Sequence, residues 1–187
     1  MMNRKIYREN YVNNLSDPSK PIYIGEYYHF DGTEKQFRVF RALMLLLSLI
    51  GVGALVLCGL QAQAGPSDDC WYCVLPWALA WLPLGMTVYS AVRLQFAELP
   101  MRIDVYRGCF RNFFGTTLAS AILALWLTVG EVIRMLAGSA SYPDDTYALV
   151  GAAVCLAASA TAFFLRSGKT FTVVENHSAK NNGNREK

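Results

Sequence analysis

Two cysteines at the start of an apolar segment, Cys70 and Cys73, have the clearest potential for chemistry in this sequence. The C-x-x-C spacing of Cys70-Trp71-Tyr72-Cys73 allows two thiols to form a disulfide and to exchange it with a partner. The apolar segment that follows would place such a pair beside a lipid bilayer, within reach of a lipid-soluble quinone. The pattern therefore indicates a candidate redox pair, although a structural disulfide or two ordinary thiols at a helix start are the simpler interpretations.

In gross plan, this arrangement resembles the quinone-reducing disulfide oxidases of bacteria. Those enzymes have four helices, both termini inside and a C-x-x-C that opens the second helix, so the resemblance implies disulfide exchange at Cys70 and Cys73. The chain departs from that family in two ways. Residues 134–146, the expected second outer loop, contain no cysteine, and no arginine follows Cys73 before Arg93. A membrane thiol-disulfide oxidoreductase therefore stays as the second alternative function.

Glu131 and Arg134 are charged residues at the end of an otherwise apolar segment. Three residues apart, they share one face of a helix. Charged residues inside a membrane span are costly to bury and often have a function. Because Glu131 falls at the outer end of its span, we expect an interfacial ion pair that water and lipid headgroups reach. Pro83, at the middle of another span, predicts a packing kink rather than a transport site, since no other span is broken by proline.

Two further sets of residues are candidates for contacts with lipid or with other helices. Small residues recur along the last apolar segment at Gly151, Cys155 and Ser159, and such spacing lets helix backbones approach closely, within one bundle or against another protein. Basic residues gather before the third apolar segment, where Arg102, Arg107 and Arg111 are candidate contacts for anionic lipid headgroups. The simpler interpretation of these arginines is that they enforce topology and extend to the headgroups.

The elements that must position these residues are four membrane-spanning helices. Apolar residues make up 53% of the chain and charged residues 17%, and the apolar residues fall in long runs. Four runs approach the length of about 20 residues that a bilayer requires. They cover residues 42–60, 74–92, 113–132 and 147–165. The predicted fold class is therefore an all-α membrane protein with a four-transmembrane-helix bundle.

The positions of the basic residues predict the topology. All but one of the 17 lysines and arginines lie in the N-terminal segment, the central loop or the tail, whereas the two remaining loops are acidic. Short loops rich in lysine and arginine stay in the cytoplasm during insertion. We therefore expect both termini on the cytoplasmic side, in the cell membrane.

The sequence divides into a cytoplasmic segment, a membrane domain and a tail. Residues 1–32 form the first, residues 33–166 the four-helix domain and residues 167–187 the tail. Thr33 and Gln36 match a capping box, which predicts a helix that runs into the first span. Residues 22–28 and 170–174 have the composition of strands and predict a small sheet, and residues 101–111 predict an interfacial helix that leads into the third span. The polar end of the tail predicts disorder.

The predicted function is that of a small multi-pass membrane protein without catalysis of its own. The sequence contains no phosphate-binding loop, no H-E-x-x-H and no G-x-S-x-G, and neither terminal segment is long enough to form a core. We expect no cofactor, no metal and no nucleic-acid partner. The expected partners are the lipid bilayer and another membrane protein or a second copy, in a structural, accessory or regulatory role. A small transporter or channel is the first alternative.

Overall fold

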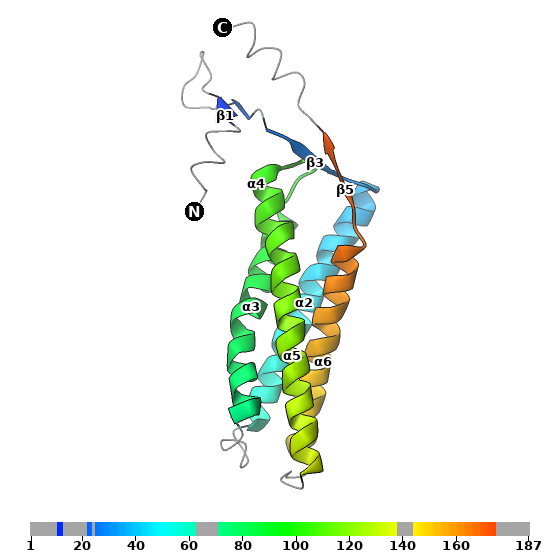
Figure 1. Ribbon diagram of the computed structural model, residues 1–187. Helices are drawn as coiled ribbons and strands as arrows, with labels where there is room; N and C mark the ends of the chain where they lie inside the picture. The colour runs from blue at the N-terminus through cyan, green and yellow to red at the C-terminus, as the bar shows by residue number, and fades with distance from the viewer. Residues whose placement is uncertain (1–10, 13–21, 24, 63–70, 138–143, 175–187) are drawn as a thin grey trace, which may run out of the picture.

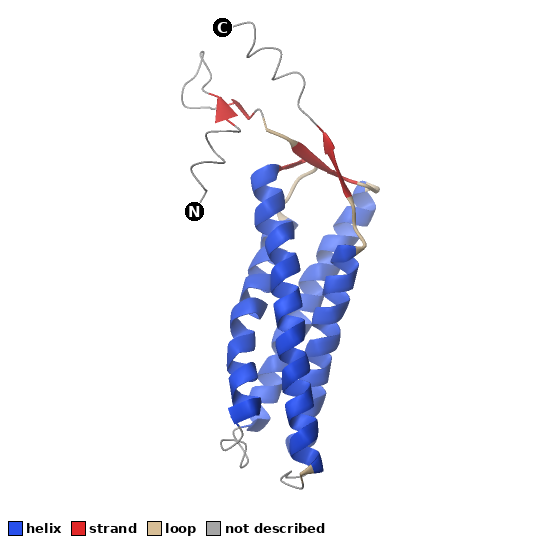
Figure 2. Cartoon of the chain, viewed as in Figure 1, coloured by secondary structure: helices blue, strands red, loops and turns tan. Residues whose placement is uncertain are grey.

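Four long helices lie side by side in a bundle, with a small sheet at one end (Figures 1 and 2). The computed structural model describes residues 11–12, 22–23, 25–62, 71–137 and 144–174. The long helices are α2 (Glu34–Ala62), α3 (Trp71–Gln95), α5 (Asn112–Leu136) and α6 (Asp144–Ser167). The described part of the chain thus contains four helical stretches long and apolar enough to cross a membrane, which confirms that coarse feature of the predicted fold.

Helix α2 begins where the capping box predicts. The backbone N–H of Gln36 donates to Oγ1 of Thr33 at 3.2 Å, and the N–H of Thr33 donates to Oε1 of Gln36 at 3.0 Å. These two bonds satisfy donors that a helix start otherwise leaves without partners. The helix then continues without a break into the first apolar segment. Phe37, Phe40 and Met44 share its buried face.

The sheet brings together three segments that are far apart in the sequence. Its strands are β3 (Tyr27–Phe30), β4 (Met101–Arg102) and β5 (Phe171–Val174), in the order β4-β3-β5, and both pairs are antiparallel. A separate pair joins β1 (Tyr11–Val12) to β2 (Ile22–Tyr23). The predicted pairing of residues 22–28 with the tail is therefore right only in part, because β5 pairs with residues 27–30 while residues 22–23 pair with β1. Strand β4 was not expected from the sequence.

The third long helix is preceded by two short helical elements. These are α4 (Ile103–Tyr106) and the π-helical turn η2 (Arg107–Arg111), which leads directly into α5. The expected helix before the third span is therefore present from Ile103, whereas Met101 and Arg102 lie in the sheet. Helix α3 begins at Trp71, so both Pro76 and Pro83 lie inside it.

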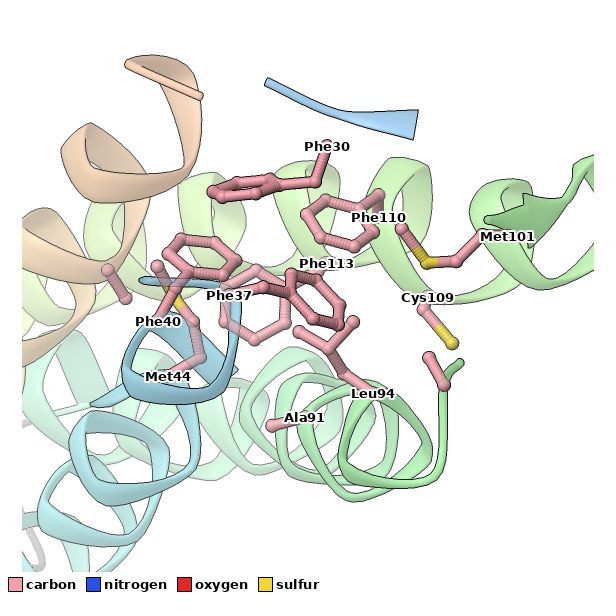
Figure 3. Packing of buried hydrophobic residues seen from close by; sticks show 12 residues of the cluster. Phe30, Phe37, Phe40, Met44, Ala91, Leu94, Met101, Cys109, Phe110 and Phe113 are labelled. Carbon is pink, nitrogen blue, oxygen red and sulfur yellow. The ribbon is translucent and has the colours of Figure 1, made fainter. Parts of the chain in front are cut away.

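Aromatic side chains fill the space between the sheet and the bundle (Figure 3). We call this group the aromatic cap; its members are Tyr28, Phe30, Phe37, Phe40, Tyr106, Phe110 and Phe171. Phe30 from β3 lies over Phe37 of α2, with ring centroids 5.4 Å apart, and contacts Phe171 of β5 at 5.6 Å. Such tilted and edge-to-face pairs add to the free energy of burial. The cap therefore attaches the sheet to the helices by side-chain packing.

Close backbone contacts hold the helices together along their seams. Helix α2 packs mainly on α6, and α5 packs on both α3 and α6. A Cβ added at Gly151 of α6 would lie 2.8 Å from the carbonyl oxygen of Ala54 in α2, closer than real Cβ contacts. Glycine is therefore required there for the two backbones to meet. Only 33–39% of the most apolar stretch of each helix is buried. Most residues of these stretches therefore lie on the outside of the bundle and make its surface apolar.

Candidate functional site

The two cysteines of the C-x-x-C motif fall at the edge of what the structure describes. Cys70 lies outside the described residues. Cys73, in the first turn of α3, is buried and faces α5, because a Cβ added at Gly130 would lie 3.1 Å from its Sγ. The Cys73 thiol is thus covered by a neighbouring helix rather than presented to solvent. The structure does not describe the geometry of the pair.

Glu131 and Arg134 form an ion pair inside the bundle. Nε of Arg134 lies 3.4 Å from Oε2 of Glu131, and each side chain is only 3% exposed. The expectation that water and headgroups reach this pair is therefore wrong. The reason is that the inward face of α5 continues to its last turns, through Ala124 and Leu127, and both charged residues fall on it. Burial of charges carries a desolvation cost that an exposed pair avoids.

A buried thiol lies near this ion pair, and a second buried thiol lies close to the first. Cys58 of α2 is close enough to Glu131 and Arg134 for their charges to act on it, and it is also close to Cys155 of α6. Cys58 and Cys155 are both part of the hydrophobic cluster at this end of the bundle. The end of the bundle away from the sheet therefore combines thiols from α2, α3 and α6 with an ion pair from α5. Sequence reasoning treated these residues separately, since only the tertiary packing brings them to one place.

A second feature of the interior is a group of buried hydroxyl side chains contributed by all four long helices. We call it the hydroxyl layer; it contains Ser48, Thr87, Ser90, Thr117, Ser120 and Ser159. The buried apolar residues form two clusters, and the hydroxyl layer lies between them. On α2, for example, Ser48 lies between Met44 of one cluster and Ala54 of the other. The core is therefore apolar at both ends and polar between them.

The hydroxyl layer is only partly satisfied by hydrogen bonds. Ser48 donates to the carbonyl of Met44 at 2.7 Å, and Thr117 donates to that of Phe113 at 2.8 Å. Ser90 and Ser120 are only 1% and 2% exposed, and the Oγ of each has no hydrogen-bond partner. Buried hydroxyls without partners are uncommon because they lose their hydration. The sequence signal for this layer was the presence of serine and threonine at helical spacing on inward faces, which drew no functional prediction.

The residues predicted as a helix-packing face lie inside the bundle. Gly151, Cys155 and Ser159 are all buried on α6, and Gly151 meets the backbone of α2 beside Ala54 and Cys58. Of the two options that the sequence left open, the structure shows contact within the bundle at this face.

The arginines at the sheet end differ from one another in their contacts and exposure. Arg41 is half-buried, and its Nη1 donates to the carbonyls of Gln95 at 2.9 Å and Ala97 at 3.1 Å, at the end of α3. Arg102 lies over the ring of Tyr23 at 5.5 Å. Two other arginines predicted as lipid contacts, Arg107 and Arg111, lie in η2 with exposed side chains.

The described residues contain no group of three or more histidine, cysteine or acidic side chains arranged to hold a metal ion. Comparison of the chain with models of protein families, with curated proteins and with solved structures found no match.

Proposed function

We propose that this protein is an integral membrane protein that crosses the cell membrane four times and keeps both termini in the cytoplasm. Four helices of sufficient length and apolar character support the crossings. The concentration of basic residues in the segments at the sheet end supports the orientation. The sheet and the aromatic cap then lie at the cytoplasmic surface.

Resistance to alkaline carbonate extraction tests the insertion, and side-specific thiol labelling tests the orientation. In a cysteine-free background, Lys35→Cys should react with a membrane-impermeant maleimide only after the membrane is opened. Ser67→Cys should react in intact cells. The reverse pattern would contradict the orientation, and release of the protein by carbonate would contradict the insertion.

Within the membrane, we propose a non-catalytic role, in which the protein is a structural, accessory or regulatory subunit that binds another membrane protein or a second copy of itself. The observation that supports this role is the division of its surfaces. The small residues of α6 are used within the bundle, whereas the open glycines Gly53 and Gly85 lie on outward faces with no atom within 4 Å of an added Cβ. Exposed large apolar side chains lie on the same helices, for example Leu82, three residues before Gly85. A partner helix can approach such faces closely.

The mass of the protein extracted from its own membrane in mild detergent tests this role. We expect a particle larger than one 20.8-kDa chain, which loses its partner or its second copy when Gly53→Leu or Gly85→Leu fills an outward face. Both changes point away from the core, so the bundle itself should remain folded. Cys70→Ser with Cys73→Ala is the matched control and should leave the particle intact. A monomer in native extracts would contradict the proposal.

The hydroxyl layer favours a second candidate function, that of a small transporter or channel. Hydroxyl groups from all four helices, two of them without partners, offer hydrogen bonds to a polar solute inside an apolar bundle. Flux of protons, sodium or potassium into proteoliposomes tests this candidate. It predicts flux that Ser90→Ala with Ser120→Ala abolishes and Ser48→Ala retains. Vesicles that remain tight to these ions and to small polar solutes would exclude it.

A further inference from the structure

Three arginines at the sheet end of the bundle come from the two elements that meet at one seam, and none of them forms an ion pair with a described carboxylate. They are Arg93 at the end of α3 and Arg107 and Arg111 in η2. Glu131 and Arg134, at the other end of the bundle, form an ion pair. The nearest carboxyl in sequence to Arg107 belongs to Asp104, three residues earlier, whose buried Oδ1 has no hydrogen-bond partner. Within the described part of the chain, no carboxylate lies within ion-pair distance of the three guanidinium groups.

A glycine brings the arginine of α3 against the turn that carries the other two. Nη1 of Arg93 lies 3.2 Å from the position that a Cβ on Gly108 would take, so it occupies the space that a side chain would fill. Gly108 directly follows Arg107, and Arg111 comes four residues after Arg107, which places both arginines on one helix face. Three positive charges along this seam outnumber the single carboxylate of Asp104 near it, and an anion bound between the arginines would reduce their mutual repulsion. The seam between α3 and η2 is thus suited to bind an anion.

The surface directly below these arginines is apolar and open. Gly115 follows Arg111 by one helical turn, and no atom lies within 4 Å of a Cβ added there. On α3, the ring of Tyr89 lies one turn below Arg93, whose Cζ is 5.8 Å from the ring centroid. The open position at Gly115 on α5 and the exposed ring of Tyr89 on α3 leave room for a hydrocarbon chain along the two helices. Cationic groups above an open apolar strip match the two halves of a phospholipid.

We propose that this seam binds an anionic phospholipid of the cytoplasmic leaflet. Arg93, Arg107 and Arg111 hold the phosphate, and one acyl chain lies over Gly115 beside Tyr89. Arg102, which the sequence grouped with Arg107 and Arg111, is not part of this site because its guanidinium lies over Tyr23. Arg93 joins the site instead. The inference rests on the proposed membrane insertion, which carbonate extraction tests separately.

Native mass spectrometry of protein released from nanodiscs tests the site. The nanodiscs contain phosphatidylglycerol and phosphatidylcholine with the same acyl chains, and the measured quantity is the amount of each lipid retained. We expect the protein to retain phosphatidylglycerol preferentially. Arg111→Gln should weaken this retention about fivefold, and Arg107→Gln with Arg111→Gln roughly 25-fold, because each basic residue near an anionic surface contributes a similar factor.

A second variant separates lipid binding from simple charge attraction. Gly115→Leu keeps every charge but fills the open position at Gly115. A Cβ at this position meets no protein atom within 4 Å, so the fold should be unaffected. We expect it to lose the retained phosphatidylglycerol. The matched control is Arg102→Gln, which should bind as the unmodified protein does.

Three results would overturn the proposal. Equal retention of the two lipids would show that the arginines do not select a headgroup. A loss with Arg102→Gln as large as that with Arg111→Gln would indicate diffuse charge rather than a site. Displacement of phosphatidylglycerol by millimolar inorganic phosphate, together with an unaffected Gly115→Leu variant, would assign the arginines to free phosphate. Each of these results can occur in a fully inserted protein, so none of them is confused with failure of membrane insertion.

Discussion

Gly151 marks the closest approach between two helices of the bundle. Gly151→Ala would place a Cβ 2.8 Å from the carbonyl oxygen of Ala54 and 3.1 Å from the backbone nitrogen of Cys58, so α6 must move away from α2. We expect the free energy of unfolding to fall by about 1–3 kcal/mol, as for other overpacked sites. Unfolding by sodium dodecyl sulfate in mixed micelles measures this change.

A matched glycine on the neighbouring helix provides the control for that experiment. Gly53 of α2 is equally helical, but an added Cβ there meets no atom within 4 Å. Gly53→Ala should leave the protein as stable as before or stabilise it by up to about 1 kcal/mol, because alanine is the better helix former. Similar losses in the two variants would show that α2 and α6 do not meet at Gly151.

The ion pair of Glu131 and Arg134 is suited to a double-mutant cycle. Arg134→Met leaves a buried carboxylate without its cation, which we expect to cost about 3–5 kcal/mol. Adding Glu131→Gln should recover part of that loss, so that the double variant is more stable than the sum of the two single changes predicts. Additive losses in the same unfolding assay would mean that the two charges do not interact in the folded protein.

The pairing of β3 with β5 connects the segment before α2 to the segment after α6. His29 is the register partner of Thr172, and both side chains are exposed. His29→Cys with Thr172→Cys should therefore form a disulfide on mild oxidation, seen as a shift in non-reducing electrophoresis, because directly opposed residues have Cβ atoms about 5 Å apart. The control pairs His29→Cys with Val173→Cys, which shifts the register by one residue and points the thiols to opposite faces. A stronger crosslink in the control would contradict the register.

The local sequence predicts some of the helices and strands but not others. The start of α2 was predictable because a capping box depends on residues three apart. The apolar lengths of the four long helices were predictable because each run approaches the span of a bilayer. Strand β4 was not predictable, since Met101 and Arg102 are strand residues only through their pairing with Tyr28 and Tyr27 of β3. Two residues carry no periodicity of their own.

The hydroxyl layer affects the stability of the bundle as a whole. Ser90 and Ser120 each bury an Oγ without a partner, so Ser90→Ala and Ser120→Ala remove an unsatisfied group. We expect each change to stabilise the protein by about 1 kcal/mol. Ser48→Ala is the control, because its hydroxyl is bonded to Met44, and it should give a smaller gain or a loss. Destabilisation by the first two changes would indicate that the layer is hydrated, since the hydroxyls would then have water as a partner.

The number of long apolar helices and the charge of their connecting segments follow from composition along the chain, because each long run of apolar residues corresponds to one helix. The chemistry of the interior depends on something else, namely which face of each helix turns inward. One step along a helix rotates a side chain by about 100°, so small differences in packing decide whether a residue is inside or outside. The packing turned Glu131 and Arg134 into the bundle, placed Ser90 and Ser120 between two apolar clusters, and brought Arg93 of α3 against Gly108 of η2. These contacts join residues far apart in the sequence, so local sequence patterns do not predict them.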